Sequence, residues 1–168
     1  MSRCVRSFLR VALFVSLAAS AEAQPNPYAT IEAWLHAPAG RTIGAASSIA
    51  AARDGTLWIA ERCGANDCSA SADVAPIIHA DAAGNVLASF GAGRFAWPHG
   101  IRVDADGNVW ITDARGGNGR GHQVLKFSPA GVLLLALGEA GVAGSDSAHF
   151  NGPTDVAVRT PACSLYVQ

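Results

Sequence analysis

The sequence lacks an apolar run long enough to span a membrane as a helix. Its main apolar run, VALFVSLAAS at residues 11–20, falls well short of the roughly 20 residues that a bilayer core requires. Charged residues are also scarce, at 15% of the chain, and they form no cluster of one sign. The composition therefore indicates neither a nucleic-acid partner nor an anionic membrane surface.

The N-terminus does have the three parts of a secretory signal peptide. Residues 3–10 carry three arginines, residues 11–20 are apolar, and residues 21–23 (AEA) form a small-residue cleavage site. We expect cleavage after Ala23, which removes three of the 12 basic and one of the 13 acidic residues and leaves a net charge of −3. The sequence thus predicts a secreted or periplasmic protein with no membrane anchor.

Cysteine is scarce as well, with four in the chain, of which Cys4 would leave with the signal peptide. Cys63 and Cys68 flank the short loop GAND. Neighbouring cysteines tend to pair in an oxidising compartment, so we predict a Cys63–Cys68 disulfide. A zinc-binding pair is the alternative, although further ligands are hard to find nearby. Cys163 has no evident partner.

Helical periodicity is weak after the signal peptide, and a β repeat organises the chain instead. Residues 48–60 (SIAAARDGTLWIA) align with residues 100–112 (GIRVDADGNVWIT), and each reads as a strand, an Asp-Gly turn and a second strand. Residues 77–91 align with residues 124–138 in the same way, and a third copy starts at Pro153. Four strands over about fifty residues is the period of a propeller blade.

The predicted fold class is therefore all-β, an incomplete β-propeller of about two and a half blades. We expect a signal peptide at 1–23, an N-terminal segment at 24–46 with an outer strand at 28–36, and blades over 47–168. Trp58 and Trp110 take matching strand positions, which predicts packing in the core. A propeller normally closes a ring of about 4–8 blades, so isolated blades would expose apolar edges and we expect poor solubility.

Three strings point to a family: PHGIRVDADGNVWITD (98–113), HQVLKFSPAG (122–131) and LGEAGVAGSDSAHFNGPTDVAV (137–158). They resemble NHL-repeat propellers, and among these the peptidyl-α-hydroxyglycine α-amidating lyases and their bacterial relatives. The resemblance implies six blades and a catalytic zinc on the propeller axis held by three histidines, the first of which matches His99. It also implies a substrate-binding catalytic arginine, matched by Arg62, and a structural calcium on the main-chain carbonyl of Ile101.

The same resemblance places the other two zinc histidines and a tyrosine base in blades that would follow residue 168. His149 matches a histidine of the family that is not a ligand, so this chain is expected to be inactive by itself. The alternative function is a non-catalytic propeller that binds a peptide, glycan or protein partner, since a fold does not settle a function. The glycine-rich stretch 114–121 joins two strands and opens no helix, which argues against a phosphate-binding loop.

Overall fold

The computed structural model describes residues 24–71, 73–159 and 164–168, and these contain strands but no helix. The predicted signal peptide and Cys163 lie outside the described residues. The chain divides into two compact units, one ending at Ile31 and the other covering Glu32–Gln168. The described residues of the first unit, 24–31, are exposed and have no regular secondary structure, so the fold is that of the second unit.

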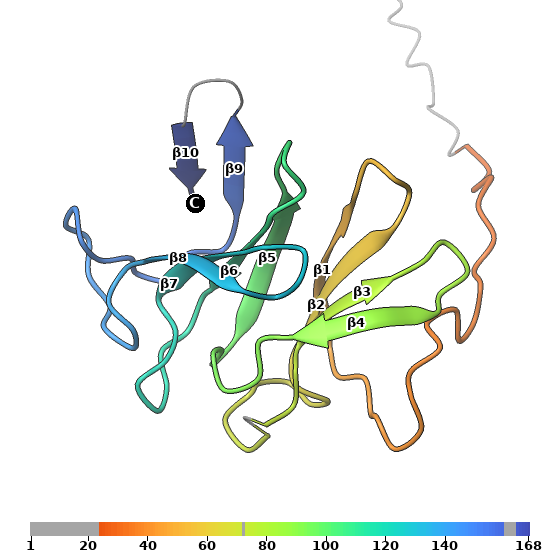
Figure 1. Cartoon of the computed structure of the whole chain (residues 1–168), viewed down its shortest axis with the longest axis horizontal. Helices are drawn as coiled ribbons and strands as arrows, with labels where there is room; N and C mark the ends of the chain where they lie inside the picture. Colours follow the sequence, from red (N-terminus) through yellow and green to blue (C-terminus); the bar gives the residue numbers. More distant parts are fainter. Residues whose placement is uncertain (1–23, 72, 160–163) are drawn as a thin grey trace, which may run out of the picture. The chain divides into compact units, whose positions relative to one another are not determined.

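Two four-stranded antiparallel sheets and one two-stranded sheet make up the second unit (Figure 1). In each sheet the strands are hydrogen-bonded in the order in which they follow one another in the chain. The first sheet contains β1 (Ala46–Ala51), β2 (Leu57–Glu61), β3 (Ile77–Ala80) and β4 (Val86–Phe90). The second contains β5 (Pro98–Val103), β6 (Val109–Asp113), β7 (Gln123–Phe127) and β8 (Leu133–Leu137), and the third contains β9 (Val156–Arg159) and β10 (Ser164–Val167).

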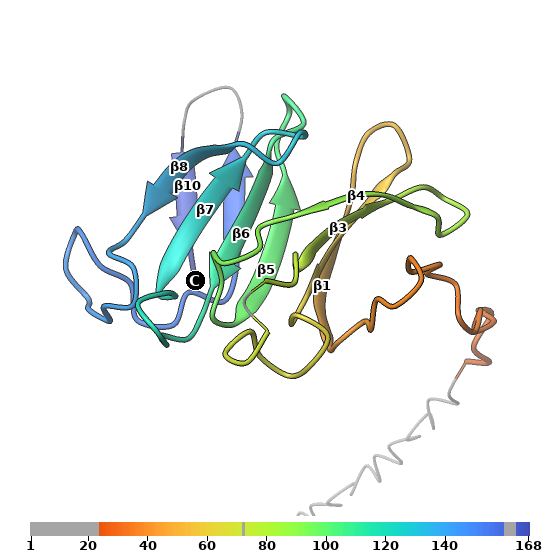
Figure 2. The ribbon, with the colours of Figure 1, turned by 60° about the horizontal axis from the view of Figure 1, so that its bottom comes forward.

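This arrangement confirms the predicted fold class, an incomplete β-propeller. Each four-stranded sheet is one blade. Neighbouring blades contact each other through their first strands. Strands β1 and β5 lie side by side, as the view in Figure 2 shows, and β5 in turn contacts β9. The first strands of the three sheets thus follow one another as the inner strands of consecutive propeller blades do.

Asp-Gly turns form both of the predicted hairpins. Gly55, between β1 and β2, has a φ of 84°, and Gly107, between β5 and β6, has a φ of 83°. Only glycine adopts this left-handed backbone conformation without strain. The two turns are therefore fixed locally by the sequence, and they set the register of the paired strands that follow.

The core lies between the two four-stranded sheets. Its largest cluster combines Trp58 of the first sheet with Ile101, Val109 and Phe127 of the second, all of them almost fully buried. Trp110 is also buried, and it packs on the other side of the second sheet against Val156 of β9. Both tryptophans thus belong to the core, as their matching positions predicted.

Strand β5 approaches the third sheet closely at Gly100. A Cβ atom on Gly100 would lie 2.6 Å from the carbonyl oxygen of Thr154 and 3.0 Å from the Cα atom of Asp155. Real Cβ contacts are not that short, so the absence of a side chain at Gly100 allows the two inner strands to meet. This contact brings the main chain at Thr154 next to the start of β5.

The outer strand predicted for residues 28–36 is not formed. A single isolated bridge joins His36 to Asn85, and the amide of His36 donates to the carbonyl of Gly84 at 2.7 Å. Trp34 and Leu35 instead pack against the buried side of the first sheet. Side-chain packing rather than a hydrogen-bonded ladder holds this segment. No helix in the described residues has the length and hydropathy to cross a bilayer.

Candidate functional site

Two of the sequence-predicted site residues, Arg62 and His99, lie at one end of the two four-stranded sheets, next to a third residue, Arg115. Arg62 directly follows β2, His99 is the second residue of β5, and the loop that begins after β6 carries Arg115. Antiparallel pairing places the end of β2, the start of β5 and the end of β6 at the same edge, which is the lower edge in Figure 1. The Asp-Gly turns lie at the opposite end.

Trp97 is the centre of this site. The guanidinium carbon of Arg62 lies 3.6 Å from the centroid of the Trp97 ring, and that of Arg115 lies 4.0 Å from it. The imidazole of His99 is 5.1 Å away, centroid to centroid. The indole Nε1 donates to the carbonyl of Asn66 at 3.0 Å, which fixes the ring. Two cations and one imidazole thus surround a single, oriented indole.

His99 is held by the main chain of the neighbouring blade. Its Nδ1 lies 2.8 Å from the carbonyl oxygen of Thr154. Because a carbonyl oxygen only accepts hydrogen bonds, Nδ1 carries the proton and Nε2 has a free lone pair in the neutral ring. The aligned positions of the other two sheets, Ser47 and Thr154, carry hydroxyl side chains instead.

Asp113, the last residue of β6, fixes the segment that leads into His99. It is fully buried, and its two carboxylate oxygens accept the amides of Ala96 at 2.8 Å and of Trp97 at 2.6 Å. Burial raises the pKa of Asp113 to about 6, against these two hydrogen bonds, which lower it. The carboxylate therefore acts as an anchor for the backbone of the site.

Arg62 is prepared for an anion by its surroundings. Its Nε atom is buried and has no hydrogen-bond partner, and no carboxylate among the described residues forms an ion pair with its guanidinium. Burial, and then the positive charge of Arg115, lower the pKa of Arg62 from its ordinary value. Arginine stays charged under any physiological condition, so the site keeps an uncompensated positive charge.

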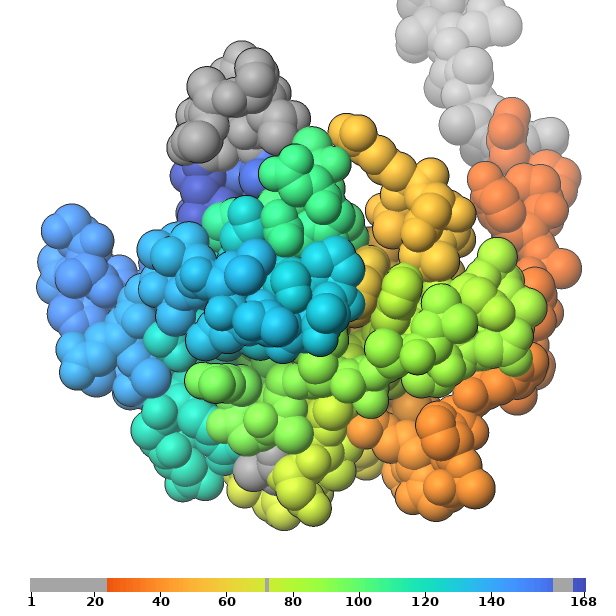
Figure 3. All heavy atoms as spheres, viewed as in Figure 1, coloured from red at the N-terminus to blue at the C-terminus, as the bar shows by residue number. Residues whose placement is uncertain are grey.

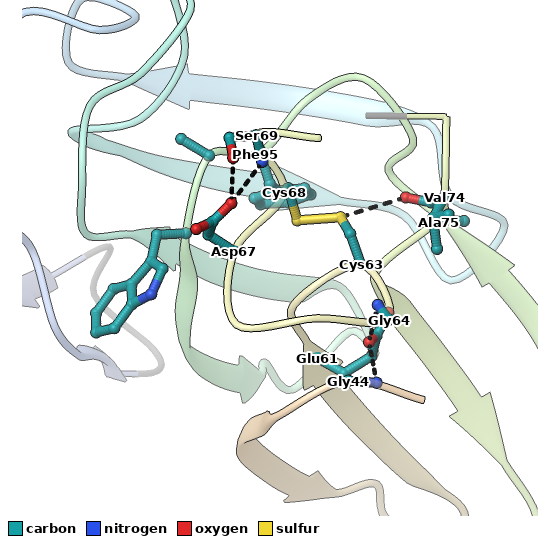
Figure 4. The surroundings of a disulfide bond; sticks show 12 residues. Gly44, Glu61, Cys63, Gly64, Asp67, Cys68, Ser69, Val74, Ala75 and Phe95 are labelled. Carbon is teal, nitrogen blue, oxygen red and sulfur yellow. Dashed lines mark hydrogen bonds between the residues drawn. A yellow bond between two sulfur atoms is a disulfide. The ribbon is translucent and has the colours of Figure 1, made fainter. Parts of the chain in front are cut away.

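The loop after Arg62 is closed by the predicted disulfide, which joins Cys63 and Cys68 (Figure 4). Both cysteines are buried. At the base of the same loop, the buried carboxylate of Glu61 accepts the amides of Gly44 and Gly64, each at 2.8 Å. The disulfide and this carboxylate hold the loop at both ends, and so they hold Arg62 against Trp97.

Two of the other histidines are engaged elsewhere. His149 has its ring nitrogens against Asp146 and Glu139, and hydrogen bonds that the ring donates to these two carboxylates raise its pKa. His79 is stacked on Trp58 at the turn end of the first sheet. Among the residues that the structure describes, no group of three histidine, cysteine or acidic side chains could hold a metal ion. His99 is therefore a single candidate ligand in this part of the chain.

The residues do not fit the calcium expected at Ile101. The carbonyl oxygen of Ile101 accepts a hydrogen bond from Nη1 of Arg102 at 2.9 Å, and Arg102 in turn forms an ion pair with Asp155. A guanidinium already lies at the oxygen where a cation is expected, and like charges repel each other at such distances. No calcium is assigned to this position.

Sequence reasoning missed Trp97, Arg115 and Asp113 as members of the site. Trp97 directly precedes the Pro98-His99 pair, so an aromatic residue beside a candidate ligand was a usable signal. Asp113 aligns with Glu61 in the repeat, and an acidic residue at both strand ends was a second one. Arg115 lies in a glycine-rich loop, where nothing in the sequence predicts that its guanidinium turns back onto the indole.

The fold and the repeat together define a class of protein: an incomplete β-propeller with an NHL repeat, whose family model matches residues 95–127. Over 74 residues the chain is 45% identical to a probable peptidyl-alpha-hydroxyglycine alpha-amidating lyase of Caenorhabditis elegans. Over 84 residues it is 42% identical to the peptidyl-glycine alpha-amidating monooxygenase of Mus musculus. The chain is therefore similar to the amidating lyases and monooxygenases, as the sequence motifs indicated.

These similarities cover part of each protein. They span 44% and 49% of this chain, but 20% of the nematode relative and 8% of the mouse relative. Among solved structures, a structural genomics protein of unknown function from Bacteroides thetaiotaomicron aligns with 61% of this chain and 27% of its own, at 20% identity and a TM-score of 0.46. That likeness is too slight to support a conclusion.

Proposed function

We propose that these blades are part of an exported, zinc-dependent lyase that splits a peptidyl-α-hydroxyglycine into a peptide amide and glyoxylate. The names of the similar proteins supply the activity. The orientation of His99 is the structural observation on which the assignment of the site to this chain depends.

The hydrogen bond between His99 and Thr154 supports a role as a metal ligand. Metal-binding histidines usually donate their other ring N–H to a carbonyl or a carboxylate, which fixes the tautomer and the ring plane. Here Nδ1 donates to the Thr154 carbonyl at 2.8 Å, and Nε2 is left to bind a metal. A plain surface histidine has no need of such a main-chain partner.

A zinc site of the expected kind needs three imidazoles and one open position. The described residues supply His99 alone, so we propose that histidines of further blades complete the site. We expect the 168 residues by themselves to show no lyase activity. Polarisation of the substrate hydroxyl is the chemistry that zinc would supply there when bound.

The residues of this chain would bind and orient the substrate. Arg62 would pair with the carboxylate of the terminal hydroxyglycine, because it has no carboxylate partner of its own and a planar guanidinium suits a carboxylate. Trp97 would hold the plane of that guanidinium by stacking. Asp113 would keep the segment from Ala96 to His99 in register through its two amide contacts.

Export is supported by two observations. The N-terminus has the pattern of a signal peptide, and Cys63 and Cys68 form a disulfide, as is usual in oxidising compartments. We propose that the chain functions in a secreted or periplasmic location, where a disulfide at the base of the site loop would persist.

Zinc analysis of the full-length protein and of a His99→Ala variant tests the proposal. The wild type is expected to contain stoichiometric zinc and to release glyoxylate from a hydroxyglycine-extended peptide, and His99→Ala is expected to lose both. His149→Ala is the matched control, because His149 faces Asp146 and Glu139 on an exposed loop and should leave zinc and turnover unchanged. Undiminished zinc in His99→Ala would contradict the assignment.

The same experiment separates the alternative function. If the full-length protein binds peptides but contains no zinc and releases no glyoxylate, it is a binding propeller rather than a lyase. In that case Arg62 and Trp97 would still form the recognition site, since neither their stacking nor the free positive charge depends on a metal.

A further inference from the structure

A cleft lies beside Trp97. It has a volume of about 160 Å³, and the loop after β6 forms one wall while the disulfide-closed loop forms the other. Figure 3 shows these two loops, residues 114–121 and 62–71, next to each other at the lower edge of the molecule. The lining includes Arg115, Arg120 and Trp97 as well as Asp67 and Ser69.

The cationic wall of this cleft is preformed. Within the loop after β6, the backbone groups of Gly117 and Arg120 pair in both directions, at 3.0 and 3.1 Å. Nη1 of Arg120 donates to the carbonyl of Phe95 at 2.9 Å, and the guanidinium of Arg115 is stacked on Trp97. Both arginines are thus placed before a ligand arrives, which lowers the entropic cost of binding.

The protein balances the charges of the cleft only in part: Arg115 acts at a distance on Asp67, and Arg120 acts at a distance on Asp113. Two arginines line it against the single carboxylate of Asp67, and no ion pair of Arg115 or Arg120 exists among the described residues. Asp67 is itself occupied, because the amide and the hydroxyl of Ser69 both donate to its Oδ1. Arg62 adds a third positive charge on the same indole.

Like charges gathered on one aromatic ring repel each other, and an anion placed beside them reduces that repulsion. We propose that this cleft binds the carboxylate of an acidic side chain in a peptide ligand, with Arg115 and Arg120 as the residues that select it. The peptide nature of the ligand rests on the proposed function. The preference for an acidic side chain rests on the cleft, and it extends the specificity of the site beyond the terminal carboxylate that Arg62 would bind.

Asp67 favours a peptide over a free inorganic anion. A peptide has N–H groups as well as a carboxylate. Its N–H groups can donate to Oδ2 of Asp67, which Ser69 does not contact, while its carboxylate accepts hydrogen bonds from the arginines. A small anion would meet the negative charge of Asp67 with nothing to donate. Free phosphate or sulfate therefore matches the residues that line this cleft less well than an acidic peptide does.

Equilibrium binding of two blocked tripeptides to the full chain tests the proposal. Acetyl-Ala-Glu-Gly and acetyl-Ala-Gln-Gly have the same shape and differ in one charge. We expect the Glu peptide to bind about tenfold more tightly, as a charge-assisted hydrogen bond to arginine allows, with a preference that weakens as salt is added. Quenching of tryptophan fluorescence, or calorimetry, gives both affinities without any metal or turnover.

The variants assign the preference to residues. Arg115→Gln is expected to bring the two affinities within about twofold of each other, whereas Arg53→Gln, on the turn at the other end of the first sheet, should leave the preference unchanged. Equal binding of the two peptides by the wild type would overturn the proposal, as would failure to bind either. So would a preference that survives in a double Arg115→Gln, Arg120→Gln variant.

These outcomes are separate from those for the lyase. A His99→Ala variant that lacks zinc should still prefer the Glu peptide if the cleft selects acidic side chains. If a variant loses zinc and glyoxylate release but still prefers the Glu peptide, only the metal site is affected. If a variant keeps zinc and glyoxylate release but loses the preference for the Glu peptide, only the cleft is affected.

Discussion

The first and second blades use one position of the repeat in two different ways. Glu61 ends β2 and Asp113 ends β6, and both carboxylates are fully buried and accept amides from the segment that leads into their own blade. Glu61 also forms an ion pair with Arg41, with 2.6 Å between Nη2 and Oε1. Asp113 has no contacting cation among the described residues, and its pKa is raised to about 6.

The two blades thus differ in how they compensate the charge of this buried carboxylate. In the first blade the buried acid is compensated, and the result is a rigid anchor for the disulfide-closed loop. In the second blade the acid is left without a cation so that both of its oxygens can hold the backbone at Ala96 and Trp97. The blade that carries His99 therefore holds a buried carboxylate without a contacting cation, and the positive charge of Arg120 acts on it only from a distance.

The tryptophans at matching positions of the two blades also have different partners. Trp58 is stacked on His79 with ring centroids 4.0 Å apart. Trp110 instead donates to Asp104 at 3.0 Å, and Lys126 forms an ion pair with the same carboxylate oxygen. Burial alone would raise the pKa of Asp104, but hydrogen bonds from Trp110, Lys126 and Asn108 outweigh it and lower the pKa to about 2.

Removing the two strand-end carboxylates gives the largest expected contrast. Glu61→Ala leaves Arg41 and two amides without their partner, so we expect a loss of about 3–5 kcal/mol in the free energy of unfolding. Asp113→Ala frees two amides but no cation, and a loss of about 1–3 kcal/mol is expected. Urea denaturation measures both, with Asp106→Ala on an exposed turn as the control. If the two variants lost the same free energy of unfolding, the buried carboxylates of the two blades would not differ as described.

The pH dependence of stability sharpens the same comparison. Since the pKa of Asp113 is raised from 3.8 to about 6, the folded chain holds this proton over a range where the unfolded chain has lost it. Its contribution is complete below pH 3.8 and is lost as the pH rises through 6. The wild type should therefore gain on the order of 2 kcal/mol relative to Asp113→Asn between pH 7 and pH 4.

Denaturation of both proteins across this pH range provides the check. The difference between wild type and variant cancels the titration of the other carboxylates, so its slope belongs to Asp113. A difference that stays flat, or that grows as the pH rises, would mean that the two amide hydrogen bonds outweigh burial at this site.

The smallest expected effect concerns the inner strands. In Gly100→Ala the new Cβ would meet the Thr154 carbonyl at 2.6 Å, and we expect a cost of about 1–2 kcal/mol from the forced displacement. The aligned residue of the first blade is Ser48, and Ser48→Ala should change stability by less than about 0.5 kcal/mol. Hydrogen exchange should show the loss of protection concentrated in β9 and at the start of β5. Uniform loss would argue against a local clash.

The strands of the blades could be predicted because their determinants are local. Asp54-Gly55 and Asp106-Gly107 set the hairpins, and Trp58 and Trp110 mark the buried positions, so a short window of sequence contains the cause. The outer strand at 28–36 was wrong for the opposite reason. A strand exists only if a neighbour offers its edge, and here the first sheet offers one bridge at His36.

The site was predicted in part for a similar reason. Arg62 and His99 follow from motifs that resemble a family, and the structure brings both to Trp97. The role of Arg115 depends on how a glycine-rich loop folds back in space, and that has no periodic signature. The carbonyl of Thr154 could not be foreseen either, because every residue carries a carbonyl and only the contact between blades selects this one.

Because His99 contacts the main chain at Thr154, the orientation of its ring does not depend on which side chain stands at position 154. The acceptor is a main-chain oxygen, which any amino acid at position 154 would provide, so mutation there cannot delete it as mutation can delete a carboxylate. What can disturb it is a shift of one blade against the next. The orientation of the imidazole therefore depends on how the second and third blades are assembled, and a displaced third blade would release the His99 ring.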